Sequence, residues 1–173
     1  MANVMKREKQ LAVLKLLVEG NSIRSTERIT GASRNAIMRL LVRFGSACRE
    51  FLDLNLCNLY LEHVELDEIW TFVRKKQRQL QGFEIVDPEI GDIYVFTAID
   101  QKTKLLASFA VGKRTHETTR ALVADLNRRM IRPPVEMGAD RPQLSTDGWA
   151  SYVPTIRAQF GKKVRHRLTF RIN

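Results

Sequence analysis

The spacing of apolar residues changes near residue 57, and this change restricts the folds that the chain can form. Before this point apolar residues recur three and four positions apart, which is the period of a helix with one buried face. After it come short runs rich in β-branched and aromatic residues, which favour strands. We therefore expect two domains and an α+β or α/β fold class: an all-α domain at residues 1–57, and a mixed sheet with helices at residues 58–173.

The first domain is predicted to contain three helices. Residues 6–19 form the first, and Ser22 caps a short second helix. Gly31 then makes a tight turn, and Ser33 caps a third helix that we expect to end near Gly45. The residues expected to face inward are Leu11, Leu14, Leu17 and Val18 on the first helix and Ile37, Leu40, Leu41 and Phe44 on the third.

A short helix, a glycine turn and a capped third helix are typical of a helix-turn-helix, which lays its last helix in the major groove of DNA. Arg and Asn are the side chains that form paired hydrogen bonds with guanine and adenine. The net charge of +10 also favours a polyanionic partner, because Lys and Arg release counterions from phosphates. We predict that duplex DNA binds to Arg24, Arg28, Arg34, Asn35, Met38, Arg39 and Arg43.

An ordinary three-helix bundle with a solvated basic face is the alternative for this domain. Glu27 departs from the helix-turn-helix pattern. Its position, four residues before the turn glycine, usually holds a small residue because the two helices touch there.

The second part of the chain is predicted to alternate between strands and helices after an initial run of three strands. The strands are expected at residues 61–73, 92–99, 105–111, 143–146 and 163–172. One helix is expected from Thr115 to about Met130, and a less clearly patterned one at 150–160. This order is that of an RNase H-like, integrase-type sheet, in which the first and fourth strands lie side by side.

Two aspartates occupy corresponding places on those neighbouring strands. Asp67 lies within the first strand and Asp147 directly follows the fourth, so we expect both side chains at one point. Two adjacent carboxylates repel each other unless cations neutralise them. Such a pair can hold Mg²⁺ or Mn²⁺ ions about 4 Å apart for attack on a phosphodiester.

A purely structural role would also explain why each aspartate occurs at its position, if the two are considered separately. Asp147-Gly148 is a common turn dipeptide, and Asp67 beside Glu68 is compatible with a solvated strand edge. The large apolar neighbours of Asp67 favour a functional role, because an unpaired buried charge is costly. Asp100 also ends a strand, and we assign it to the hairpin turn that follows.

Other features exclude several classes of protein. No apolar run approaches the roughly 18 residues that span a bilayer, and the first residues lack the apolar core of a signal peptide. Cys48 and Cys57 are not accompanied by a second Cys or His pair at zinc-site spacing, so we interpret them as buried or incidental thiols. We expect a soluble, cytoplasmic protein without a membrane partner.

Five short motifs together resemble the bacterial DDE transposases of the insertion-sequence-one family, over roughly residues 20–173. This resemblance implies an RNase H-like fold, metal-dependent cutting and joining of DNA ends, and the first two acids of the triad at Asp67 and Asp147. The motifs are Ser33-Arg34-Asn35, Glu65-Leu66-Asp67-Glu68-Ile69-Trp70, Thr97-Ala98-Ile99-Asp100, Gly112-Lys113-Arg114-Thr115 and Thr146-Asp147-Gly148-Trp149.

The chain departs from that family in two respects. It has no ligand set for the usual N-terminal zinc finger, and no Asp or Glu follows Asp147, where the third acid of the triad is normally a Glu. Glu68 is expected to face away from Asp67 and Glu117 to lie on the wrong helix, so neither is expected to replace that acid. We therefore expect a C-terminally incomplete catalytic domain that is weakly active or inactive.

Three functions stay open at this point. The first is a DNA transposase, or part of one, that acts on element ends with Mg²⁺ or Mn²⁺ and assembles as a homo-oligomer. The second is a site-specific DNA-binding repressor whose second domain only oligomerises. The third is a bacterial regulator with an unrelated sensory domain.

Overall fold

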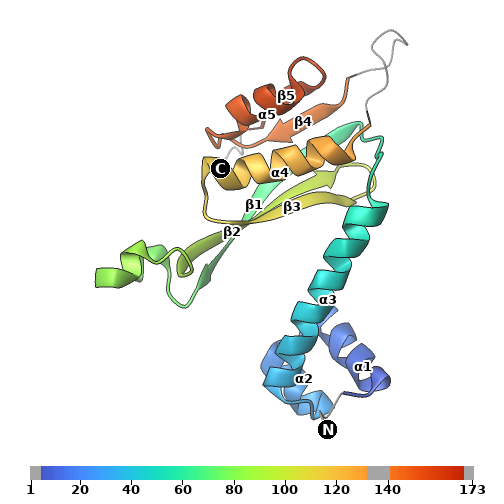
Figure 1. Cartoon of the computed structure of the whole chain (residues 1–173), viewed down its shortest axis with the longest axis vertical. Helices are drawn as coiled ribbons and strands as arrows, with labels where there is room; N and C mark the ends of the chain where they lie inside the picture. Colours follow the sequence, from blue (N-terminus) through green and yellow to red (C-terminus); the bar gives the residue numbers. More distant parts are fainter. Residues whose placement is uncertain (1–4, 132–140, 170–173) are drawn as a thin grey trace. The chain divides into compact units, whose positions relative to one another are not determined.

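The first part of the chain is all helical and the second part combines strands with helices in the computed structural model, which describes residues 5–131 and 141–169 (Figure 1). Residues 1–55 form one compact unit and residues 56–173 form another. The boundary lies close to the change in hydrophobic pattern near residue 57. No helix in the described parts of the chain is both long enough and apolar enough to cross a bilayer.

The first unit consists of α1 (Arg7–Val18), α2 (Ile23–Thr30) and α3 (Arg34–Asn55). Its small core is formed by Val13, Ala32, Ile37 and Leu40. Leu14, Leu17 and Leu41 pack against that core, as expected, whereas Leu11, Val18 and Phe44 are exposed. The buried stripe of α1 is centred on Val13, so Leu11 and Val18 lie on its flank.

Capping groups fix both ends of α2. The Ser22 hydroxyl accepts a hydrogen bond from the backbone N–H of Ser25, and Gly31 ends α2 with a left-handed φ of 64°. The expected end of the third helix at Gly45 is wrong, because α3 continues to Asn55. An interior glycine costs a helix only about 1 kcal/mol, which the long flanking helical segments can offset.

The second unit contains a five-stranded sheet with the order β3-β2-β1-β4-β5. Its strands are β1 (His63–Val73), β2 (Gly91–Asp100), β3 (Leu106–Gly112), β4 (Gln143–Thr146) and β5 (Arg165–Leu168). β1 pairs antiparallel with β2 and parallel with β4, and β4 pairs parallel with β5. The predicted adjacency of the first and fourth strands is therefore present; residues 170–172 of the last expected strand lie outside the described residues.

Two helices, α4 (His116–Arg129) and α5 (Tyr152–Phe160), cover one face of this sheet (Figure 1). Alternate residues of β1, such as Val64 and Leu66, point into the core between sheet and helices because strand side chains alternate between faces. Their partners in the core include Phe96, Ala98, Leu122, Leu126, Leu144, Tyr152, Ile156 and Phe160.

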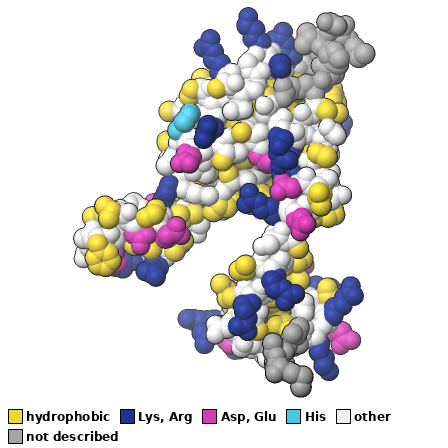
Figure 2. Space-filling view, viewed as in Figure 1, with side chains coloured by type: hydrophobic (Ala, Val, Ile, Leu, Met, Phe, Trp, Pro, Cys, Tyr) yellow, Lys and Arg dark blue, Asp and Glu magenta, His cyan; other side chains and the backbone are white. Residues whose placement is uncertain are grey.

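A two-stranded ribbon extends β1 and β2 past the helices, and two short 3₁₀ turns, Gln77–Gln79 and Gly82–Val86, connect its ends. Hydrophobic side chains are visible over its surface in Figure 2, and the exposed ones include Ile69, Trp70, Phe72, Phe83, Ile85 and Val86. At the opposite end of β2, Asp100 accepts hydrogen bonds from the backbone and hydroxyl of Thr103. The turn role assigned to Asp100 is therefore confirmed.

On α4, Asp125 forms an ion pair with the buried side chain of Arg129, which also binds the backbone at the start of the second unit. Arg129 is almost fully buried; it donates to Asp125 at 2.6 Å and to the backbone carbonyl of Leu56 at 3.1 Å. Burial by itself would raise the pKa of Asp125, but hydrogen bonds from Arg129, Ser108 and Arg128 outweigh it and hold the pKa below its usual range.

Asp125→Asn should lower the free energy of unfolding by about 2–4 kcal/mol, because it removes the charged partner that binds the buried Arg129 guanidinium at 2.6 Å. Since the folded pKa of Asp125 is depressed, its contribution is present at neutral pH and is lost as the pH falls through that value. Urea unfolding at pH 7 measures the difference, with the exposed Glu62→Gln as control. Equal stability of the Asp125 variant and the parent would contradict this role.

Candidate metal centre and nucleic-acid surface

The strand pairing brings Asp67 and Asp147 together across 79 intervening residues, a separation read directly from the sequence. Leu66 on β1 pairs with Thr146, the last residue of β4, and the residue that follows each of them along the chain is one of the two aspartates. One carboxylate oxygen from each lies within 4.8 Å of the other. The sheet therefore produces the juxtaposition that the order of the strands predicts.

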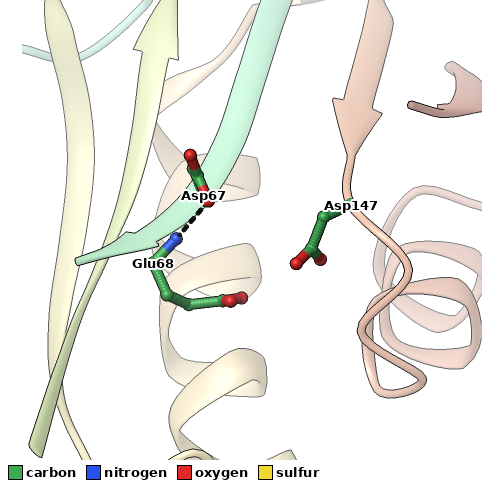
Figure 3. Close-up of side chains that lie close together, drawn as sticks. All are labelled: Asp67, Glu68 and Asp147. Atoms are coloured by element: carbon green, nitrogen blue, oxygen red, sulfur yellow. Dashed lines mark hydrogen bonds between the residues drawn. The ribbon is translucent and has the colours of Figure 1, made fainter. Parts of the chain in front are cut away.

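Glu68 adds a third carboxylate to the same group, also within 4.8 Å (Figure 3). The expectation that Glu68 faces away from the site is wrong. Asp67 and Glu68 do point in different directions, but Asp147 follows the end of β4, and its carboxylate and that of Glu68 point toward one another in Figure 3. Because Asp147 lies beyond its strand, it can be reached from either face of β1.

The Glu68 side chain is only 4% exposed, because it extends the inward row of Val64 and Leu66. Burial raises the pKa of Glu68, and the negative charge of Asp147 adds to this, while Tyr152 and Arg114 lower it. Burial, followed by the nearby Glu68 carboxylate, raises the pKa of the Tyr152 hydroxyl. Within the described residues, neither the Tyr152 hydroxyl nor Oε1 of Glu68 has a partner with full hydrogen-bond geometry.

Arg114 bridges two of the three carboxylates. Its Nη2 atom lies 2.9 Å from Oε2 of Glu68 and 3.3 Å from Oδ2 of Asp147. The guanidinium also lies over the ring of Trp149, 4.5 Å from its centroid, and 5.8 Å from that of Tyr94. Arg114 belongs to a motif noted in the sequence, but its role depends on contacts across 46 and 33 residues, which spacing along the chain does not reveal.

Backbone and side-chain hydrogen bonds orient Asp147. Its Oδ1 accepts from the backbone N–H of Trp149 at 2.9 Å, which is the turn role considered for Asp147-Gly148. Its other oxygen, Oδ2, faces Arg114. The Thr146 hydroxyl is hydrogen-bonded to Nε2 of His166 on β5 at 2.9 Å. Burial lowers the pKa of this histidine. The turn therefore fixes the Asp147 side chain while one oxygen stays directed at the acidic group.

This donor set fits a divalent cation such as Mg²⁺ or Mn²⁺. Carboxylate oxygens are the ligands that these hard ions prefer, and the three atoms are close enough to share one. Oε1 of Glu68 is buried and makes no hydrogen bond of full geometry, although the Tyr152 hydroxyl lies near enough to lower the pKa of this carboxyl. Asp67, Glu68 and Asp147 would hold the ion.

The residues predicted to contact DNA all lie on the surface of the helical unit. Arg24, Arg28, Arg34, Asn35, Met38, Arg39 and Arg43 are exposed, and Figure 2 shows Lys and Arg side chains spread over this unit. Glu27 has a local role: it accepts the backbone N–H of Arg34 at 3.1 Å and pairs with the Arg34 guanidinium at 3.0 Å. It therefore helps to cap α3, and it engages one of the predicted contacts.

The sequence allowed the two cysteines to be either buried or incidental thiols, and the structure shows that they are not buried. Cys48 and Cys57 are both exposed and unbridged. The acidic group of Asp67, Glu68 and Asp147 is the only set of three or more metal-binding side chains found within the described residues.

Asp147→Asn and Glu68→Gln should each weaken Mn²⁺ binding by about tenfold or more, because each removes a charged ligand. Isothermal titration calorimetry with MnCl₂ measures the affinity. Asp87→Asn, which removes the same charge from the loop before β2, should leave it unchanged. Equal Mn²⁺ affinity in all three variants would rule out this cluster as the metal site.

No protein-family model matches this sequence, and no curated protein sequence matches it. Among solved structures, it is similar to a piggyBac transposase synaptic complex with hairpin DNA, with 13% identity over 96% of the chain and a TM-score of 0.44. It is also similar to a Mos1 transposase paired-end complex with the left transposon end and to a Mos1 mariner paired-end complex with Mn. Both have 14% identity, over 97% and 96% of the chain, with TM-scores of 0.36 and 0.38. The chain spans 41% of the piggyBac chain and 60% of each Mos1 chain.

Proposed function

We propose that this chain is a transposase-type protein that binds DNA and carries out metal-dependent phosphodiester cleavage and strand transfer at the ends of a mobile element. The observation that carries the proposal is the meeting of Asp67, Glu68 and Asp147 on neighbouring strands of the sheet. The motif resemblance to the insertion-sequence-one family agrees with this chemistry, and it places Asp67 and Asp147 in the catalytic roles.

We assign the second unit to the RNase H-like class. β2 pairs antiparallel with both β1 and β3, β4 pairs parallel with β1, and β5 pairs parallel with β4, in the order β3-β2-β1-β4-β5. Helices α4 and α5 cover one face of the sheet. In this arrangement the acids of β1 and β4 meet at the middle of the sheet, where a phosphodiester can reach them.

The side chains at this site suit phosphoryl transfer. A bound divalent cation would activate water or a 3′-hydroxyl and stabilise the leaving oxygen. Asp67, Glu68 and Asp147 would hold the ion, and the turn at Asp147 limits the rotation of its carboxylate. The expectation of little or no activity rested on the lack of a third acid near the pair. Glu68 supplies a third carboxylate, and we propose a weakly active chain.

The first unit is proposed to bind duplex DNA as a helix-turn-helix, with α3 in the major groove. The capped start of α3 and the exposed Asn35 and Arg39 support this assignment. The pairing of Arg34 with Glu27 leaves its side chain 60% exposed, so its remaining guanidinium N–H groups can still reach a base or phosphate. The homo-oligomer expected from the sequence stays a prediction, which light scattering of the purified chain can measure.

The catalytic part of the proposal predicts slow nicking of supercoiled plasmid DNA by the purified chain in the presence of Mn²⁺. Nicking should fall to background in Asp67→Asn and in Asp147→Asn, since each variant loses a charged metal ligand. Asp87→Asn should nick like the parent. A band that is equally strong in the Asp67 and Asp147 variants would show a contaminating nuclease and would contradict the proposal.

A site-specific repressor is the competing function. The ion pairs of Arg114 favour it, because they partly neutralise the acidic group without metal. DNA binding without any metal affinity or nicking would support the repressor.

The DNA-binding part predicts that Arg39→Ala and Arg34→Ala each weaken binding to a preferred duplex by about 1–3 kcal/mol. Lys15→Ala, which removes an exposed charge from α1, should cost less because it lies outside α3. Fluorescence anisotropy at several salt concentrations measures these affinities, and binding should weaken steeply as salt rises. If the double variant of Arg34 and Arg39 bound as tightly as Lys15→Ala, α3 would not be the recognition helix.

A further inference from the structure

Arg114 occupies a position where a divalent cation would have to compete with it. Its guanidinium binds Oε2 of Glu68 and Oδ2 of Asp147, two of the three carboxylates in the acidic group. Three carboxylates within 4.8 Å of one another repel strongly unless cations lie among them. In the structure, the cation in contact with Glu68 and Asp147 is Arg114.

The surroundings of Arg114 distinguish these pairs from an ordinary surface salt bridge, which contributes little. Its partner Glu68 is 4% exposed, so that carboxylate needs a counter-charge. The residues on both sides of Arg114 are held in place: the Lys113 side-chain ammonium donates to the carbonyl of Ile90, and the Thr115 hydroxyl caps α4 by accepting the backbone N–H of Thr118. The start of the Arg114 side chain is therefore anchored beside the acids.

The aromatic contacts offer the guanidinium a second support. It lies 4.5 Å from the ring centroid of Trp149 and 5.8 Å from that of Tyr94, and its side chain is 36% exposed. Cation–π contacts of this kind hold an arginine without using all of its N–H groups. Arg114 can thus leave the carboxylates and stay on the edge of the site with donors directed outward.

We propose that Arg114 is the internal counter-cation of the acidic group, that a divalent cation displaces it from Glu68 and Asp147, and that it then binds a DNA phosphate beside the ion. The proposal rests on the proposed function, since it assumes that Asp67, Glu68 and Asp147 bind metal. A planar guanidinium suits this role because it binds phosphate with two parallel hydrogen bonds. Arg114 is a positioning residue before the metal binds and a phosphate-binding residue afterwards.

The first test is Mn²⁺ affinity, measured by calorimetry at constant ionic strength. Arg114→Gln should tighten Mn²⁺ binding by about tenfold or more, because it removes a positive charge that contacts the ligands. Arg114→Lys keeps that charge and should bind Mn²⁺ within about threefold of the parent. Arg120→Gln removes an exposed charge from α4, the helix that follows Arg114, and is the matched control.

The outcomes of this experiment are distinguishable. Unchanged or weaker Mn²⁺ binding in Arg114→Gln would overturn the proposal, while weaker binding in Asp147→Asn would still uphold the metal site. Equal Mn²⁺ affinity in Asp147→Asn, Glu68→Gln and the parent would overturn the proposed function itself. A merely structural role for Arg114 would predict weaker binding on its removal, which is the opposite sign.

Trp149 provides an optical signal for the displacement. The chain has two tryptophans, so Trp70→Phe leaves Trp149 as the only one. In this background, saturating Mg²⁺ should change the Trp149 emission, because the guanidinium over the ring moves away from its bridging position. The change should be much smaller in Arg114→Gln, which has no guanidinium to move. Emission that is insensitive to Mg²⁺ while calorimetry detects binding would contradict displacement.

The phosphate-binding step is tested with duplex DNA in Ca²⁺, which occupies carboxylate sites, so that binding is measured without cleavage. Adding Ca²⁺ should strengthen DNA binding by the parent, and Arg114→Gln should lose about five- to tenfold of that affinity, with Arg114→Lys in between. Arg120→Gln should retain the gain. An equal gain in the parent and in Arg114→Gln would show that Arg114 does not bind phosphate.

Discussion

Mutual repulsion among three carboxylates is the constraint around which the second unit is organised. Asp67, Glu68 and Asp147 lie within 4.8 Å of one another, and each pair at about that distance costs roughly 1–4 kcal/mol, depending on how well solvent screens it. A nearby cation offsets this cost, and Arg114 does so for two of the three carboxylates. The second unit therefore keeps three carboxylates together although their repulsion opposes folding. Such a cluster of acidic side chains is characteristic of a metal-binding site.

The fold maintains this arrangement because the acids are attached to well-packed strands. Val64 and Leu66 are fully or almost fully buried just before Asp67, and Leu144 is buried shortly before Asp147. Parallel pairing of β1 with β4 then sets the register of the two aspartates. Packing of these strands thus keeps the three carboxylates close together in spite of their repulsion. Their combined negative charge can then attract a cation.

The sequence predicted those parts of the structure that depend on local pattern. The fourth strand has the expected bounds, Gln143–Thr146, because it is a short run between clear turns. Leu11 and Val18 were placed wrongly because α1 has apolar residues on more than one side, and only packing selects the stripe centred on Val13.

The part of the candidate site that depends on local sequence pattern was predicted, and the part that depends on tertiary contacts was not. Asp67 and Asp147 followed from the order of the strands, which is a property of the pattern. Glu68 did not, because alternation along a strand assigns it to the other face and does not report that Asp147 has already left the sheet. Arg114 depends on contacts between distant segments, and no periodicity in the sequence encodes them.

The central claim is that these carboxylates are a metal centre from which a divalent cation displaces Arg114. Anomalous diffraction from crystals of the chain grown with Mn²⁺ tests it most directly. The account predicts a manganese peak bound by Asp67 and Asp147, with Glu68 directed toward it and the Arg114 guanidinium no longer bonded to either Glu68 or Asp147. Crystals grown at saturating Mn²⁺ with no peak at this group and with both Arg114 ion pairs intact would contradict it.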